Sequence, residues 1–339
     1  MYMGHRAGRE RGPEVAGPRG GRGSPAVALD IGGTKTAAAL VSDRGEILGS
    51  ATMATRGGHA DLLAGMERLV IEAVGPVGLA EVSGLGISSA GPIDLASGTV
   101  APVNIPELRG LPLLKRMAAL VPGRPARLLG DGLAAAAGEH WVGAGQGFED
   151  LLAIVVSTGV GGGLVLRGRL HGGASGNAGH VGHAPVVMDG DPCPCGGIGC
   201  PEAYASGPSM VAFAVRSGWR TDARPDGEAL AEAARRGEPA AVLAFERGAG
   251  ALAAMIAAAA ATCDLRRVII GGGVAAAGPV LMDPLRRSLG RYLSLTFLAG
   301  LEVVPAGLGA RASLIGAAAA VHEPDRYAIS EVTASLVSS

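Results

Sequence analysis

The chain carries the same local pattern twice: a buried strand, a glycine-rich turn and a second strand. In the first copy the apolar residues 26–31 lead into Gly32-Gly33 and then into residues 36–41. The second copy begins with a strand over 151–156 and a glycine turn over 157–163. Apolar runs bounded by glycine are typical of buried strands. A repeat this distant predicts two related lobes, each presenting a glycine turn to one shared cleft.

Strand patterns alternate with helical spacing along the chain, and this alternation predicts an α/β fold. Between the strands, apolar residues such as Leu62, Met66 and Leu69 recur at the spacing of one helix face. The expected strands cover residues 26–31, 36–41, 47–55, 82–88, 126–129, 151–156, 164–170 and 267–270, and the expected helices cover 59–74, 209–217, 227–236, 239–262 and 312–321.

The 339 residues are enough for two compact lobes with separate cores. Residues 1–24 hold five arginines and no periodicity, so we expect a disordered leader, with a nucleic-acid-binding arm as the less favoured alternative. The expected organisation is a leader over 1–24, an N-terminal lobe over 25–125, a C-terminal lobe over 126–306 with a zinc loop at 183–202, a closing helix over 307–322 and a tail over 323–339.

Charge and hydropathy exclude several partners. The net charge is −1, from 29 basic and 30 acidic residues, so no overall field attracts nucleic acid or an anionic membrane. The longest uncharged apolar stretch, residues 248–263, is shorter than the about 20 residues that a membrane span needs. No secretory signal pattern opens the chain. We therefore expect a cytoplasmic protein with small-molecule substrates.

The first glycine turn has the composition of a phosphate site. Asp30 ends a buried strand, and backbone N–H groups in the turn that follows can bind phosphate oxygens while the carboxylate holds Mg²⁺ or its water. An ordinary hairpin turn is the alternative, but the second lobe repeats the arrangement. Neither turn has the spacing of a P-loop or of a dinucleotide-binding loop. The residues assigned to ATP and its phosphates are Asp30, Gly32, Gly33, Thr34, Lys35, Thr158, Gly159, Gly161, Gly272 and Gly273.

A cysteine cluster gives the most specific signal. Cys193, Cys195 and Cys200 follow His183 within 18 residues, and one imidazole with three thiols forms a closed, structural zinc set. A disulfide is the alternative, but Cys193 and Cys195 are too close in sequence for an easy bridge, and three cysteines leave one unpaired. Cys263 is expected to be a small core residue.

Together these motifs resemble the ROK family of sugar kinases and sugar-responsive repressors over roughly residues 25–322. The resemblance rests on Asp30-x-Gly-Gly-Thr-Lys35, Gly86-x-x-x-x-Gly-Pro-x-Asp94, Ser157-Thr-Gly-x-Gly-Gly-Gly163, Gly182-His183 and the cysteine run that ends at Glu202. It implies an actin-like, ribonuclease-H-like two-lobed ATPase fold with a sugar in the interlobe cleft. It also implies ATP-dependent phosphate transfer to a sugar hydroxyl, usually at C6, and a homodimer.

The resemblance further assigns roles to single residues. Asp131 matches the catalytic base, although without the resemblance a helix N-cap before Gly132 explains it equally well. His183 matches a residue that binds zinc through one ring nitrogen and the sugar through the other. The residues that the resemblance places at the sugar are Gly91, Asn104, Asp131, His180, His183 and Glu202.

Two positions depart from the family pattern. Gly130 stands where an asparagine normally precedes the base, and His180 stands where a glutamate normally binds sugar hydroxyls. The run around His180 resembles bacterial N-acetylmannosamine kinases, whereas residues 90–94 resemble glucokinases. We expect an ATP- and Mg²⁺-dependent kinase that phosphorylates a hexose or N-acylhexosamine at the 6-hydroxyl. The alternative is a catalytically impaired sugar-binding sensor or regulator of the same family.

Overall fold

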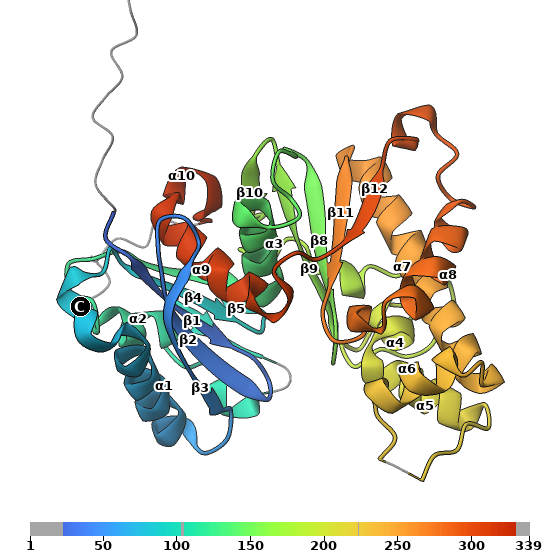
Figure 1. The fold of residues 1–339 in the computed structure, drawn as a ribbon, viewed down its shortest axis with the longest axis horizontal. Helices are drawn as coiled ribbons and strands as arrows, with labels where there is room; N and C mark the ends of the chain where they lie inside the picture. The colour runs from blue at the N-terminus through green and yellow to red at the C-terminus, as the bar shows by residue number, and fades with distance from the viewer. Residues whose placement is uncertain (1–22, 103–104, 223, 330–339) are drawn as a thin grey trace, which may run out of the picture.

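The computed structural model describes residues 23–102, 105–222 and 224–329, and it shows two α/β lobes that lie side by side (Figure 1). Each lobe is built on one five-stranded sheet. The first sheet has the order β3-β2-β1-β4-β7 and the second the order β10-β9-β8-β11-β12. The first sheet comprises β1 (Ala26–Ile31), β2 (Lys35–Val41), β3 (Ile47–Ala54), β4 (Leu85–Ser89) and β7 (Ala126–Gly130). The second comprises β8 (Leu151–Val156), β9 (Val160–Leu166), β10 (Arg169–His171), β11 (Arg267–Gly271) and β12 (Glu302–Pro305).

The two sheets share one topology, which confirms the expected two-lobed α/β fold. In each, the first three strands form an antiparallel meander, and the next two strands pair in parallel on the other side of the first. A short hairpin, β5 (Ile93–Asp94) with β6 (Thr99–Val100), follows β4 in the first lobe. The glycine turn of each lobe therefore lies at the end of the central strand of its sheet.

Two helices join the lobes. Helix α3 (Asp131–Val142) packs on β8 and β9, helix α9 (Ala312–His322) packs on β1 and β4, and the two helices pack on each other between the sheets (Figure 1). Glycine makes this approach possible: a Cβ at Gly316 would lie 1.7 Å from the carbonyl oxygen of Ala134. The core between the sheets consequently draws on both lobes.

The remaining helices cover the outer faces of the lobes. They are α1 (His59–Val74) and α2 (Leu113–Ala118) in the first lobe, then α4 (Glu202–Ala205), α5 (Gly207–Arg216), α6 (Gly227–Arg235), α7 (Pro239–Cys263) and α8 (Pro279–Leu289) in the second, and α10 (Pro324–Tyr327) near the end of the described chain. Helix α7 is long and apolar enough to cross a membrane, but 61% of its most apolar window is buried in the protein. Its residues form much of the second lobe's core.

The expected strands and helices are found at or near their places, with two corrections. The single strand expected over 164–170 is wrong, because a turn at residues 167–168, where Arg167 has a φ of 53°, separates β9 from β10. The turn expected over 157–163 is wrong beyond Gly159, because β9 begins at Val160 and ends at Leu166. Gly161, Gly162 and Gly163 are strand residues that pair with β8. Glycine is needed in this strand because the start of α3 packs closely on it: a Cβ at Gly163 would lie 2.5 Å from the carbonyl oxygen of Gly132.

The expected boundaries also shift. Strand β7 pairs with β4 at the edge of the first sheet, so that sheet continues past residue 125. The tail expected from residue 323 begins instead with α10, whose Tyr327 is fully buried. Of the expected leader, only residues 23–24 are described, and the Gly23 N–H donates to the Asp43 carboxylate at 3.1 Å. Residues 1–22 and 330–339 lie outside the described chain.

Tyr327 contacts a buried histidine, and this pair predicts a pH-dependent stability. The Tyr327 hydroxyl lies 2.9 Å from Nδ1 of His140, which is 4% exposed, and burial lowers the pKa of His140 from 6.5 to about 4. The unfolded chain binds this proton below pH 6.5 and the folded chain does not, so stability present above pH 6.5 is lost as the pH falls towards 4. We expect the free energy of unfolding to fall by about 1–2 kcal/mol between pH 7 and pH 5 from this group.

Urea unfolding at the two pH values measures this effect. In the His140→Gln variant the fall should be smaller by that amount, because glutamine does not titrate. An equal fall in the variant and the parent protein would show that His140 does not carry the effect.

Candidate active site

The first glycine turn leaves its backbone open to a ligand. The turn closes with the Gly32 N–H donating to the carbonyl of Lys35 at 3.1 Å, and Gly33, Thr34 and Lys35 are exposed. Thr55 at the end of β3 supports it from behind, since its hydroxyl donates to the Gly32 carbonyl at 2.9 Å. The turn is thus fixed on one side and accessible on the other, as a phosphate-binding turn requires.

Asp30 lies at the base of this turn. Burial raises the pKa of the Asp30 carboxyl to about 6, the Ser88 hydroxyl beside it opposes this shift, and the negative charge of Asp131 adds to it. A carboxylate that is poorly solvated and faces another carboxylate gains from a divalent cation nearby. The donor set therefore fits Mg²⁺, which the structure does not contain.

Asp131 is the first residue of α3, directly after β7. The N-cap is Gly130, so the N-cap alternative for Asp131 is wrong, although a helix does begin there. One oxygen of the carboxyl accepts the Gly132 N–H at 2.7 Å. Desolvation raises the pKa of Asp131, while this hydrogen bond and the charge of His180 lower it.

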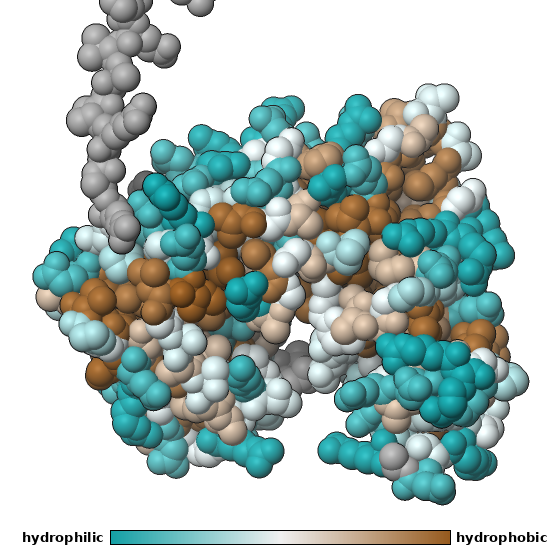
Figure 2. Space-filling view, in the orientation of Figure 1, coloured by the Kyte–Doolittle hydropathy of each residue, from teal (hydrophilic) through white to brown (hydrophobic). Residues whose placement is uncertain are grey.

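Asp131 lies near residues of both lobes. The residue is exposed to solvent, and the protein around its carboxyl still desolvates it in part. Asp30 of the first lobe and His180 of the second are both near enough to act on Asp131 or be acted on by its charge. Figure 2 shows a hollow between the two lobes. The hollow lies where the expected interlobe cleft would be, and Asp131 Oδ1 lies 4.0 Å from the position of a Cβ at Gly161 in the second lobe.

The second and third glycine clusters meet on the other side of the cleft. The Ser157 N–H donates to the Gly159 carbonyl at 2.8 Å, which leaves Thr158 exposed at the tip of the turn. A Cβ at Gly273 would lie 3.6 Å from the hydroxyl oxygen of Ser157. Gly272 has a φ of +93°, and a Cβ there would lie 2.3 Å from the Val156 carbonyl oxygen. Glycine is required at 272 for both reasons.

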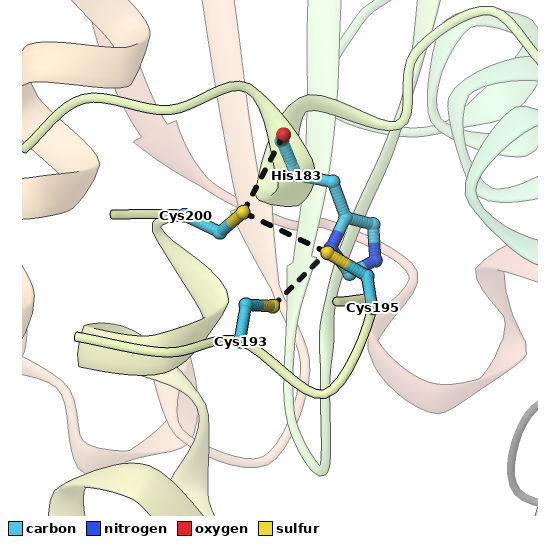
Figure 3. Close-up of side chains that lie close together, drawn as sticks. All are labelled: His183, Cys193, Cys195 and Cys200. Atoms are coloured by element: carbon cyan, nitrogen blue, oxygen red, sulfur yellow. Dashed lines mark hydrogen bonds between the residues drawn. The ribbon is translucent and has the colours of Figure 1, made fainter. Parts of the chain in front are cut away.

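The four residues expected to bind zinc lie together, as the sequence predicts (Figure 3). The ligand atoms of His183, Cys193, Cys195 and Cys200 all lie within 4.8 Å of one another. Cys195 Sγ is 3.8 Å from Cys200 Sγ, and Cys193 Sγ is 3.6 Å from His183 Nδ1. Zn–S and Zn–N bonds of about 2.3 and 2.1 Å in a tetrahedron give separations of about 3.8 and 3.6 Å. The cluster fits zinc, and all four cysteines in the described chain are free thiols, against the disulfide alternative.

His183 connects this cluster to the cleft. Its Nδ1 faces Cys193, while its Nε2 lies 3.9 Å from a carboxylate oxygen of Glu202. The same Glu202 oxygen accepts the Val160 N–H at 2.9 Å, next to the second glycine turn. The ring of His180 stacks on that of His183, with centroids 6.4 Å apart. The expected division of the His183 nitrogens between metal and sugar is compatible with this geometry.

Two further sugar candidates belong to other parts of the structure. Gly91 lies on the loop after β4, where His180 Nε2 comes within 3.4 Å of the position of a Cβ. Asn104 lies outside the described residues. Two residues of the site were not predicted from the sequence. Thr55 supports the first turn through the Gly32 carbonyl, and the carbonyl oxygen of Asn177 lies at hydrogen-bond distance from His180 Nδ1. No local pattern marks either residue, because their contacts join distant segments.

Two lobes of one α/β topology, each with a glycine turn at the end of its central strand, define the class of protein as a two-lobed, actin-like sugar kinase. The chain belongs to the ROK family, whose family model matches residues 26–324. It is 33% identical to a glucokinase of Thermotoga maritima over 88% of this chain and 97% of that protein. It is 36% identical to an N-acetylmannosamine kinase of Yersinia pseudotuberculosis over 73% of this chain and 82% of that protein.

A solved structure agrees with these relatives. A ROK family glucokinase from Streptomyces griseus, in complex with glucose and AMPPNP, superposes with a TM-score of 0.75. It is 35% identical, and the match covers 87% of this chain and 98% of that one. The family and the expected class of enzyme are therefore confirmed.

Proposed function

We propose that this sugar kinase transfers the γ-phosphate of ATP to the 6-hydroxyl of a hexose or N-acylhexosamine. The observation that carries the proposal is the Asp131 carboxyl, which begins α3 directly after β7, lies beside Gly161 of the second lobe and is within electrostatic reach of Asp30 and His180. Relatives named glucokinase and N-acetylmannosamine kinase, and a neighbour with bound glucose and AMPPNP, support this substrate class.

In this proposal Asp131 accepts the proton of the sugar hydroxyl as that oxygen attacks the γ-phosphorus and the bond to ADP breaks. Its raised pKa brings the carboxylate closer to the pKa range in which a general base works well. The amides of residues 32–35 and 157–159 bind the phosphates. Mg²⁺ held through Asp30 would neutralise phosphate charge, and zinc held by His183 and the three cysteines would fix the sugar-side loop.

Glu202, His180 and His183 face the sugar from the second lobe, with Gly91 opposite on the first. Asn104 and the expected homodimer remain predictions. The test of the proposal is a coupled ADP-release assay with glucose, mannose, N-acetylglucosamine and N-acetylmannosamine, together with calorimetric sugar binding. Turnover of at least one sugar is expected. Binding without turnover of any of them would contradict the kinase and favour the sensor alternative, which the retained Asp131 disfavours.

A substitution at Gly130 tests which sugar the site prefers. Its φ of −66° and ψ of 149° suit any residue, and a Cβ built there meets no atom within 4 Å, so the backbone does not require glycine. Open space therefore lies beside the base. In Gly130→Asn the added amide should hydrogen-bond a hydroxyl of a simple hexose and lower its KM about fivefold. Steady-state kinetics with glucose checks this, and Gly227→Asn, at the first turn of the remote helix α6, is the matched control.

The KM for ATP should stay within twofold in Gly130→Asn. A KM for glucose that rises or does not change would show that the space beside Gly130 is not at the sugar.

A further inference from the structure

Asn177 lies on the segment that follows β10 and joins the second lobe to the first. Its side-chain amide bonds both backbone polar groups of Ile93, 84 residues earlier in the chain. The Ile93 N–H donates to Asn177 Oδ1 at 3.0 Å, and Asn177 Nδ2 donates to the Ile93 carbonyl at 2.8 Å. The amide thus pairs with Ile93 as a neighbouring strand would, and it fixes both distance and orientation.

Ile93 gives this contact a rigid anchor. Its side chain is 4% exposed and belongs to the core of the first lobe, and it opens the hairpin of β5 and β6. Gly91 lies two residues before it on the same loop. A residue held to Ile93 is therefore held at a set distance from Gly91.

The backbone of Asn177 holds the other side of the site. Nδ1 of His180 lies 2.8 Å from the Asn177 carbonyl oxygen, so a neutral ring donates from Nδ1 and keeps the Nε2 lone pair available. That Nε2 is the atom 3.4 Å from the Cβ position of Gly91. One residue thereby sets where His180 points and how far it lies from the first lobe.

We propose that Asn177 is a positioning residue that clamps the two lobes together at the sugar side of the cleft. This inference rests on the proposed function, since it assigns Asn177 to the sugar half of the proposed site. Within the described chain the side chain and carbonyl of Asn177 hydrogen-bond Ile93, Ser175 and His180, whereas the first glycine turn lies at the end of β1. The clamp should therefore act on the sugar and leave nucleotide binding unchanged.

The test uses the full chain with three substitutions. Asn177→Leu removes both bonds to Ile93 at similar size, and Asn177→Asp keeps the acceptor for the Ile93 N–H and loses the donor. Ser175→Ala is the control, because the Ser175 hydroxyl accepts from Asn177 Nδ2 at 3.3 Å and its removal leaves both bonds to Ile93 in place. We expect the KM for sugar to rise about tenfold in the leucine variant and less in the aspartate variant. The KM for ATP should stay within twofold.

Ser175→Ala should match the parent protein. Equal rises in both KM values, or a loss of thermal stability with unchanged KM for sugar, would overturn the proposal. If Asn177→Leu does not fold, the aspartate variant still decides between these outcomes.

Two readouts separate the clamp from the proposed function. If the parent protein binds a sugar without turning it over, the kinase proposal fails, and the sugar Kd of each variant then replaces KM. Hydrogen exchange of residues 90–96 needs no ligand at all. We expect faster exchange in Asn177→Leu than in the parent and in Ser175→Ala, and unchanged protection would refute the clamp.

Discussion

Replacing Asp131 with asparagine should lower kcat about 10³-fold while the protein still binds sugar and ATP. Asparagine has the size of aspartate and can keep the contact with the Gly132 N–H through its oxygen, but it cannot accept the proton of the attacking hydroxyl. General base catalysis contributes roughly 10²–10⁴ to a rate, and this sets the expected loss. The measurement is kcat and both KM values by coupled ADP release.

The matched control is Asp283→Asn. Asp283 lies on α8 and pairs with Arg286 at 3.5 Å, away from Asp131 and the cysteine cluster, so its loss should change kcat less than threefold. A kcat of the Asp131→Asn variant within tenfold of the parent would exclude Asp131 as the base. Similar losses in both variants would indicate a general effect of removing a carboxylate from this lobe.

The pH dependence of the parent enzyme carries the same information. A base must be deprotonated, so kcat/KM should fall as the pH drops through the pKa of Asp131, which desolvation places above the ordinary carboxyl value. Burial raises the pKa of Asp30 to about 6, so protonation of Asp30 contributes to the same acidic fall in kcat/KM. The remaining activity of Asp131→Asn should therefore lose only the part of this fall that Asp131 contributes.

The parts of the site that the sequence predicts best are local. All four zinc ligands lie between residues 183 and 202, so spacing alone identifies them, and the first glycine turn follows from one strand and its neighbour. The repeat of that unit was enough to predict two lobes with one topology. In these cases the residues that cooperate are close in sequence.

The sequence misleads where a distant contact determines the role of a residue. Gly161 to Gly163 have the composition of a turn, but they form a strand because the start of α3 packs against them. The contact of Gly316 with Ala134 of α3 likewise joins residues 182 positions apart in the chain. Asn177 has no motif of its own, since its importance comes from Ile93. Such pairs emerge only when the chain is folded.

The second large effect should follow from disrupting the cysteine cluster. Cys200 is 1% exposed, and its Sγ lies 3.8 Å from Cys195 Sγ, so a serine there removes a buried thiolate ligand. We expect the zinc content to fall from one per chain to below about 0.1, because a structural zinc site binds tightly only with its full ligand set. Cys263→Ser is the matched control, since Cys263 lies at the end of α7 and is not part of the cluster. The Cys263→Ser protein should therefore keep its zinc.

Loss of the metal should reach the sugar through His183. With Nδ1 no longer held beside Cys193, the ring is free to turn, and its Nε2 leaves the neighbourhood of the Glu202 carboxylate. Changes around a metal ligand typically cost 10–100-fold, so the KM for sugar should rise at least tenfold in Cys200→Ser. Metal analysis by mass spectrometry and limited proteolysis of loop 183–202 give readouts independent of activity. A parent protein without stoichiometric zinc, or a cysteine variant that retains it, would contradict the assignment. That assignment rests on four ligand atoms within 4.8 Å of one another, two of whose separations, 3.8 and 3.6 Å, match a tetrahedral zinc site.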